Sequence, residues 1–501
     1  MHYSDLDWQE RLRKIENDWR SGDSKAFQQE IDQIKISQLP RKYLVEFADL
    51  LRRANRLDKA LRFLHPIFSP DSKFSEEPKA KEIATLASCQ IRLGAPDLAI
   101  HYFKNFSHLA KEYPQYKLHF AFACFATWDY KRALELLYEY RELEEDSSYE
   151  AAIADINIGA ALLVLGKNRQ AEKFLLQKVS IFQKNAWKLL SANAMELLGQ
   201  VQINLKQYSK ALDYLNKSKE LIGEPESLYY KFAEKWTFIA KLYICQNLND
   251  TKGFRQLLAD FKKTFGKERH PELRRDFEFY YAKFTKDSIR ASQLYSTTES
   301  KHYCDRIKKY FPIKTKKPTY SFFVGEAKVF KKLNYQILLK TLAKKPLLLG
   351  LLNIFLKDAY ISSRSYLYIH NVLYPGEYFN PITGPQKISR LKKRLNMELK
   401  SNAIDLCLRS KSGNYFLCSE AGIEVEISVD LRSKNTSDLI FSQCLKDLKN
   451  NYHGRSFSMM DVVSFFGESR SKSYQFIKRC LSEKKLLKLS ENKLSRYAFC
   501  E

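Results

Sequence analysis

The sequence predicts a mostly α protein, with a long helical region followed by two small domains that mix helices and short strands. Three observations lead to this prediction. The chain has 501 residues, several times the ~100–150 of a usual domain, so several folding units are expected. Its 16 Gly and 14 Pro are few for this length, which disfavours β-sandwiches and Gly-rich phosphate loops. A small residue recurs at regular spacing through the first half of the chain.

Five segments in the first 300 residues share one pattern. Each has a short polar turn, then an alanine, then a large apolar residue four positions later, as in RLDKALRFLHPIF and QYSKALDYLNKS. The alanines are 39, 34, 38 and 40 residues apart. They are Ala60, Ala99, Ala133, Ala171 and Ala211. A small residue at a fixed place in each unit allows two helices to pack closely, so the pattern predicts stacked helix pairs.

This pattern resembles the tetratricopeptide repeat. The best single match is residues 197–218, which keep Leu198 and Gly199 on the first helix and Tyr208 and Ala211 at the second. The resemblance implies a tetratricopeptide-like α-solenoid over 1–305, with roughly seven helix pairs and a concave groove that binds a protein or peptide. Aromatic residues on these helices are expected to be stacking core: Trp187, Tyr229, Tyr230 and Trp236.

The charge of the chain is concentrated after the repeats. Residues 1–300 hold 47 basic and 41 acidic side chains, a net +6, whereas residues 301–501 hold 37 and 17, a net +20. A uniformly basic protein would show an excess in both parts. The asymmetry therefore indicates a polyanion-binding region in the C-terminal two-fifths.

The segment after FPIKTKKP predicts a helix over Leu347–Leu356, a second helix from a Ser363 cap to His370, and a third helix after the loop PGEYFNPITG. On the third helix, Ile388, Leu391 and Leu395 share one face. The opposite face is polar and basic, which suits the major groove of DNA. It consists of Gln386, Ser389, Arg390 and Lys393, flanked by Lys387, Lys392 and Arg394.

The run QKISRLKKRL is similar to the recognition helix of OmpR/PhoB-type winged-helix regulators. The preceding YISSRSYLYIHNVLYPG resembles that family's positioning helix, and LRSKSGNYFL resembles its wing hairpin. The resemblance implies a winged-helix domain over 311–420, with Arg390 reading bases and Lys387, Lys393 and Arg394 on phosphates. It also implies wing contacts from Arg409, Lys411 and Asn414, although the family's glycine is Asn414 here and Gly413 stands one place earlier. The family's receiver domain has no counterpart, so phosphorelay control is not expected.

A second unit over 432–501 resembles a generic winged helix-turn-helix of bacterial regulators. Its sequence predicts a helix, a turn at Gly467, a second helix and two short strands. The second helix places Ile477 and Leu481 inward and three polar residues outward: Lys472, Gln475 and Arg479. This unit is expected either to contact DNA or to serve dimerisation and packing.

Other classes of function lack their signatures. The chain has no Walker-type loop, no GxSxG and no HExxH, and its nine Cys and nine His form no metal-ligand spacing. The apolar run 346–355 is too short to cross a bilayer, and MHYSDLDWQE does not resemble a leader. We therefore expect a cytoplasmic DNA-binding transcriptional regulator that is not an enzyme and uses no cofactor or metal. The expected partners are double-stranded DNA, a protein or peptide in the groove, and a second copy in a homodimer.

Two alternatives remain open at this point. In the first, the chain is an interaction scaffold whose winged helices bind protein; an acidic or apolar outward face on those helices would favour it. In the second, the chain binds RNA, although the aromatic stacking motifs of common RNA-binding modules are not evident.

Overall fold

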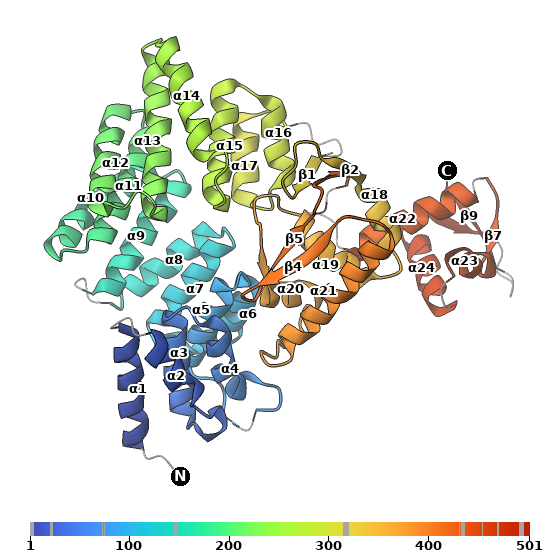
Figure 1. Cartoon of the computed structure of the whole chain (residues 1–501), viewed down its shortest axis with the longest axis horizontal. Coiled ribbons are helices and arrows are strands. Elements are labelled where there is room, and N and C mark those ends of the chain that lie inside the picture. Colours follow the sequence, from blue (N-terminus) through green and yellow to red (C-terminus); the bar gives the residue numbers. More distant parts are fainter. Residues whose placement is uncertain are drawn as a thin grey trace. The chain divides into compact units, whose positions relative to one another are not determined.

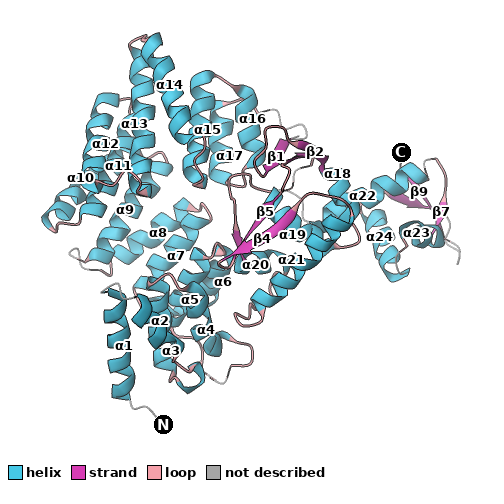
Figure 2. Ribbon diagram, in the orientation of Figure 1, coloured by secondary structure: helices cyan, strands magenta, loops and turns pink. Residues whose placement is uncertain are grey.

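The computed structural model describes residues 5–20, 24–72, 74, 76–144, 148–313, 320–429, 431, 436–452, 454–467, 470–489 and 495–500. The chain is mostly α, as predicted, with three small sheets in its C-terminal part (Figure 2). It divides into two compact units. The first unit comprises Met1–Lys314, Asp358–Lys392 and Leu408–Leu417, and the second comprises Thr315–Lys357, Lys393–Cys407 and Cys418–Glu501.

The first unit contains the repeats as a succession of helix pairs (Figure 1). The described residues give eight pairs rather than the seven expected, because the pair α15 and α16 lies beyond the last recognised repeat. The helices are α1 (Asp5–Arg20), α2 (Ser24–Asp32), α3 (Arg41–Arg53), α4 (Leu57–Phe68), α5 (Ala80–Arg92), α6 (Pro96–Asn105), α7 (Gln115–Ala126), α8 (Tyr130–Arg141), α9 (Tyr149–Val164), α10 (Asn168–Lys184), α11 (Lys188–Asn204), α12 (Tyr208–Ile222), α13 (Leu228–Asn247), α14 (Thr251–Phe265), α15 (Pro271–Thr285), α16 (Ser288–Thr297) and α17 (Lys301–Tyr310).

The repeated alanines are the close-packing positions that the sequence predicts. All five alanines of the pattern have no exposed surface, and the apolar residues four positions later are also buried. Helix α11 approaches α12 so closely that a Cβ on Gly199 would lie 2.6 Å from Cγ of Leu215. Gly159 on α9 meets Leu175 of α10 in the same way, at 2.4 Å. The spacing of small residues therefore sets how the helices of each pair approach each other.

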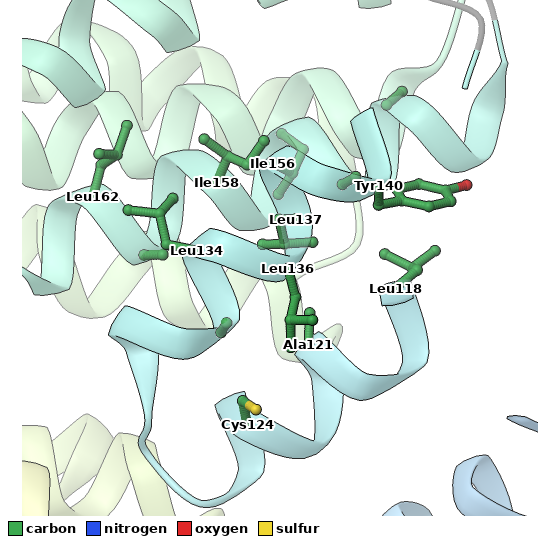
Figure 3. Close-up of a cluster of buried hydrophobic side chains, with 14 of the residues drawn as sticks. Leu118, Ala121, Cys124, Leu134, Leu136, Leu137, Tyr140, Ile156, Ile158 and Leu162 are labelled. Atoms are coloured by element: carbon green, nitrogen blue, oxygen red, sulfur yellow. The ribbon is translucent and has the colours of Figure 1, made fainter. Parts of the chain in front are cut away.

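The core of the solenoid consists of buried clusters that each extend over several repeats. Figure 3 shows part of it, where Leu118 of α7, Leu134 and Leu137 of α8 and Ile158 of α9 meet. One buried cluster extends from Ala80 to Val201, and another from Ile203 to Phe311. Each helix pair buries its apolar face only by contact with its neighbours, which is the general property of such repeats.

A segment after the repeats also belongs to the first unit. It contains β3 (Arg364–Ser365), α20 (Tyr366–Leu373) and most of the hairpin of β4 (Cys407–Lys411) and β5 (Asn414–Cys418), in the sheet order β3-β5-β4. Helix α20 begins after Ser365, whose hydroxyl accepts a hydrogen bond from the Tyr368 amide, so the predicted cap at Ser363 is wrong. The hairpin turns at Ser412 and Gly413, which have φ of 48° and 77°. Positive φ at both central residues is the geometry of a two-residue hairpin turn, so Asn414 begins the returning strand.

The start of this segment is fixed to the last repeats. The carboxylate of Asp358 accepts hydrogen bonds from the Arg275 guanidinium and from the Glu299 amide, the latter at 3.0 Å. Next to it, the Ala359 amide donates to the Thr297 carbonyl at 2.9 Å. Arg275 and Asp358 are both buried, so separating them would leave an uncompensated charge in the interior.

The following residues are fixed to early repeats. The Ser365 hydroxyl donates to the Leu93 carbonyl in the turn between α5 and α6. The Tyr366 hydroxyl donates to the Asp58 carboxylate on α4. Residues more than 270 positions apart are therefore in contact within the first unit.

The described residues of the second unit form two sheets. In one, β6 (Ile423–Ile427) lies between β1 (Tyr320–Val324), to which it is antiparallel, and β2 (Lys331–Asn334), to which it is parallel. Strand β6 is the central strand of this sheet, and its residues fall between the two expected domains, 311–420 and 432–501. Helices α18 (Tyr335–Leu342), α19 (Pro346–Leu356) and α22 (Thr436–Asn451) pack on one another.

The C-terminal end of the chain forms its own small core. In order, it contains α22, β7 (Phe457–Ser458), α23 (Met459–Phe466), α24 (Arg470–Ser482), β8 (Leu486–Lys488) and β9 (Arg496–Phe499), with the sheet order β7-β9-β8. Gly467 ends α23 with φ of +59°, at the turn that the sequence predicts. We call residues 436–500 the second module and residues 346–418 the first module, since both run helix, strand, helix, helix, strand, strand.

Candidate functional site

Helix α21 (Gly384–Ser401) is the third helix of the first module and carries the predicted basic face. Its residues up to Lys392 belong to the first unit and the rest to the second. One side of the helix is buried through Ile388, Leu391, Leu395 and Leu399. The other side is exposed and bears one amide and three cations: Gln386, Arg390, Lys393 and Arg394.

Two predicted residues on α21 are less accessible. Ser389 and Lys387 are half-buried. The Lys387 ammonium lies 2.6 Å from a carboxylate oxygen of Glu377 and 3.5 Å from the ring centre of Tyr374. The hydrogen bond from Lys387 lowers the pKa of Glu377, so this carboxylate is charged at neutral pH. The charge of Lys387 is thus already neutralised by Glu377, whereas the family resemblance implies a phosphate contact for this residue.

The hairpin next to α21 carries the other predicted residues. Arg409, Lys411 and Asn414 are all exposed. The Lys392 ammonium on α21 donates to the Ser410 hydroxyl at 2.8 Å and lies 5.9 Å from the ring centre of Tyr415. The hairpin is therefore attached to the basic helix within the first unit.

The corresponding residues of the second module are arranged differently. Gln475 is exposed, and the side chain of Lys472 lies outside the described residues. The Arg479 side chain is 35% exposed, but it is paired within the protein. Its guanidinium donates to Asp438 at 2.6 Å and to Glu483 at 2.8 Å, and it lies 4.0 Å from the ring centre of Phe441. These bonds raise the pKa of Arg479 and leave its charge neutralised locally.

The repeats contain a large groove of about 820 Å³. The sequence predicts a groove in the repeats but not the residues that line it, because these come from helices that are brought side by side only by the stacking of the repeats. The lining includes residues with side-chain amides and aromatic rings: Asn157, Asn168, Gln200, Asn204, Phe125, Trp128, Tyr130, Trp236, Tyr280 and Tyr310. Trp236, expected to be core, is 7% exposed, and its indole N–H has no partner among the described residues.

The charged groups of this groove are mutually compensated. Burial would raise the pKa of Asp276, but the charges of Lys235 and Arg306 hold it below its ordinary value. Arg306 donates to Asp276 at 2.7 Å and to the Tyr280 hydroxyl at 3.1 Å. Burial lowers the pKa of His302 to about 4, so this imidazole is neutral near pH 7. The wall consequently offers hydrogen bonds and ring faces more than net charge.

Metal-binding, membrane-spanning and reactive thiol features are the remaining kinds of site considered for the described residues. Within the described ranges, no three His, Cys, Asp or Glu side chains are grouped closely enough to hold a metal ion. Among the same residues, no helix is long and apolar enough to span a bilayer. Burial raises the thiol pKa of Cys89, Cys124 and Cys480 to about 12, which makes these three thiols poor nucleophiles.

No protein family and no curated protein matches this sequence. Several solved helical-repeat structures match it. The apo form of RapI is 18% identical with a TM-score of 0.40, covering 54% of this chain and 100% of that one. A Rap protein complexed with competence and sporulation factor is 12% identical with a TM-score of 0.45, covering 78% and 98%. The apo quorum sensor NprR from B. thuringiensis is 14% identical with a TM-score of 0.40, covering 61% and 99%. Similarity this low does not by itself indicate what the chain binds.

Proposed function

We propose that this protein is a DNA-binding transcriptional regulator whose first module is a winged helix of OmpR/PhoB type. The observation that carries the proposal is the exposed basic face of α21, with Gln386, Arg390, Lys393 and Arg394 opposite a buried apolar side. The adjacent hairpin adds exposed Arg409 and Lys411. The helix order and the sheet order β3-β5-β4 agree with this assignment.

The chemistry of this face suits duplex DNA. An α-helix fits the major groove, where a guanidinium can donate two hydrogen bonds to guanine and an amide can pair with adenine. Arg390 and Gln386 supply those two groups one helical turn apart. Lys393, Arg394 and Lys411 would neutralise phosphates and release counterions. The net charge of +20 over residues 301–501 acts in the same direction.

An acidic or apolar outward face on α21 would favour the scaffold alternative. The exposed residues of α21 are predominantly basic, which favours DNA for the first module. In the second module Arg479 is held by Asp438 and Glu483, which favours a packing or dimerisation role over base reading. RNA as a target has no specific support in the described surface.

Selection of binding sites from random duplex DNA by the full-length protein tests this proposal. Arg390→Ala should lose preference at one or two base pairs, a discrimination of about 1–3 kcal/mol. Lys411→Ala should weaken binding to all sequences about equally, because a phosphate contact carries no base information. Equal loss of preference in both variants, or no enriched site with the wild type, would contradict the proposal.

A second function is supported by the groove in the repeats. We infer that it binds an extended peptide, because its lining includes Trp236, whose indole N–H has no partner among the described residues, and several residues with side-chain amides. A peptide backbone supplies carbonyl acceptors and amide donors at regular intervals, which such side chains can meet. An unmet buried donor costs about 1–3 kcal/mol, so a ligand carbonyl at Trp236 would remove that penalty.

Display of random linear heptapeptides on phage tests the groove. The wild type should enrich a sequence family, and Ala160→Trp, which fills the groove, should abolish the enrichment. Trp236→Phe keeps the ring but removes the N–H, so it should weaken the selected peptide severalfold. Peptides that bind the Ala160→Trp variant as they bind the wild type would exclude the groove as their site.

A further inference from the structure

A separate cavity of about 360 Å³ lies within the first unit, away from the large groove. One side is formed by α4, α5 and α6 of the repeats, and the other by α20 and the loop that leads into α21. Most of its wall is apolar: Leu61, Leu64, Phe68, Leu86, Leu98 and Leu367. Its volume lies within the ~300–1,000 Å³ usual for small-molecule sites.

One polar side chain of the lining has an atom without a hydrogen-bond partner. Gln90 of α5 lines the cavity and is only 6% exposed. Its side-chain oxygen makes no hydrogen bond within the part of the chain that the structure describes. A buried carbonyl oxygen in this state costs about 1–3 kcal/mol, and native proteins rarely keep one without a reason. A ligand with one hydrogen-bond donor would satisfy it.

Aromatic rings form another part of the lining, next to Asp97 and Glu377. His65 of α4 and Tyr378 of the loop are stacked, with ring centres 5.9 Å apart and planes 17° apart. The His65 Nδ1 and the Tyr378 hydroxyl are 2.9 Å apart and share a hydrogen bond. Burial lowers the pKa of His65, so the imidazole is neutral near pH 7. A stacked pair of neutral rings of this kind favours a planar ring system.

We propose that this cavity binds a small, planar, mostly apolar molecule that carries one N–H or O–H donor, which bonds to the Gln90 side-chain oxygen. The apolar body of the ligand would lie among the leucines and against the rings of His65 and Tyr378. This site is distinct from the peptide groove and from the DNA face, so it stands or falls independently of both.

Occupation of the cavity would act on the loop that precedes α21. Tyr378 and Phe379 of that loop and Leu367 of α20 line the same cavity as the repeat helices. A ligand that contacts both the loop and the repeat helices stabilises the conformation in which the loop lies against those helices. The loop is therefore expected to be more protected from hydrogen exchange when the ligand is bound.

Calorimetric titration of the full-length protein with indole tests the site, with 1-methylindole as the analogue that lacks the N–H. Indole should bind saturably and at least threefold more tightly than 1-methylindole, because only indole can donate to Gln90. Gln90→Leu should remove this difference while retaining binding of both compounds. Gln202→Leu is the matched control, since Gln202 is also a buried glutamine with an unpartnered oxygen but lies elsewhere.

A second variant tests the same cavity without changing Gln90, in case Gln90→Leu does not fold. Leu98→Trp places a large ring in the cavity and should abolish binding of both indoles while the circular dichroism spectrum stays that of the wild type. No saturable indole binding by the wild type would overturn the proposal. An indole preference that survives Gln90→Leu, or is lost with Gln202→Leu, would overturn it as well.

Discussion

The two C-terminal modules use the same order of elements, and their third helices align residue by residue. Gln386, Ile388 and Arg390 of α21 correspond to Gln475, Ile477 and Arg479 of α24. Both isoleucines are buried, at 0% and 1% exposure. The two arginines differ, because Arg390 is exposed while Arg479 is held within its own module.

The residue four positions after each arginine explains part of this difference. In α21 it is Arg394, which repels Arg390 and leaves both guanidinium groups to solvent. In α24 it is Glu483, which accepts a hydrogen bond from Arg479 at 2.8 Å. Two helices with the same buried pattern thus display different charge, and we expect only α21 to read DNA.

The largest expected effect is on the shared buried position. Ile388→Ala and Ile477→Ala should each lower local stability by about 2–5 kcal/mol, because each leaves a cavity in a packed core. Hydrogen exchange of the full-length protein should show the loss in the module that carries the change. Only Ile388→Ala should also weaken DNA binding. Equal weakening by Ile477→Ala would remove the functional distinction between the modules.

Exchanging the residues that differ should change DNA binding in opposite directions. Arg394→Glu should reduce affinity by about a hundredfold at low salt, because it reverses one charge and pairs Arg390. Glu483→Arg should raise affinity, by tenfold at most, because Asp438 still holds Arg479. Fluorescence anisotropy with a fixed duplex measures both. A loss of affinity with Glu483→Arg would contradict the comparison.

The two aligned arginines should also differ in stability. Arg479→Ala should destabilise the second module by about 1 kcal/mol, since it removes a paired guanidinium stacked on Phe441. Arg390→Ala should leave the stability of its module unchanged within error. Hydrogen exchange of α22 and α21 gives the two values. A destabilising Arg390→Ala would show that Arg390 is structural.

The smallest expected effect is a dependence on pH. Burial raises the pKa of Asp405, but hydrogen bonds from the Ala421 amide and the Ser419 hydroxyl leave it below its ordinary value. Bonds from Ser458 lower the pKa of Asp461 in the cap of α23. A lowered folded pKa means that each carboxylate stabilises its module above the unfolded pKa and that this stability is lost as pH falls from about 5 to 3.

Asparagine variants separate the two contributions to this pH dependence. Asp405→Asn should flatten the acid loss of protection near β6, and Asp461→Asn should flatten it in α23, as followed by hydrogen exchange corrected for its intrinsic rate. A variant that leaves the acid loss unchanged would show that its carboxylate does not contribute.

The features that the sequence predicted correctly are those that depend only on residues close together in the sequence. The repeated alanines, the buried face of α21 and the turn at Gly467 all lie within one or two helices. Contacts between distant residues were not predictable in this way. Asp58 and Tyr366 are 308 positions apart, and β6 pairs with β1 across about a hundred residues.

The sequence also did not predict which charged side chains form ion pairs with other elements. Helical periodicity places Arg479 and Lys387 on polar faces, and it contains no information about a carboxylate on another element. Asp438 precedes Arg479 by 41 positions, and Glu377 lies in the loop before Lys387. The groove amides were missed for the same reason, since repeats bring them together only when they stack.

The salt dependence of DNA binding distinguishes α21 from α24 as the helix that contacts DNA. We would measure the affinity of the full-length protein for one duplex from low to moderate salt, and compare two triple alanine variants. One removes Arg390, Lys393 and Arg394 of α21; the other removes Arg470, Lys478 and Lys485, which are exposed in the second module. The account predicts that the α21 variant lowers the slope of log K against log salt by about 2–3, and that the other changes it by less than about 1. A wild-type slope in the α21 variant, or a larger change in the second-module variant, would contradict it.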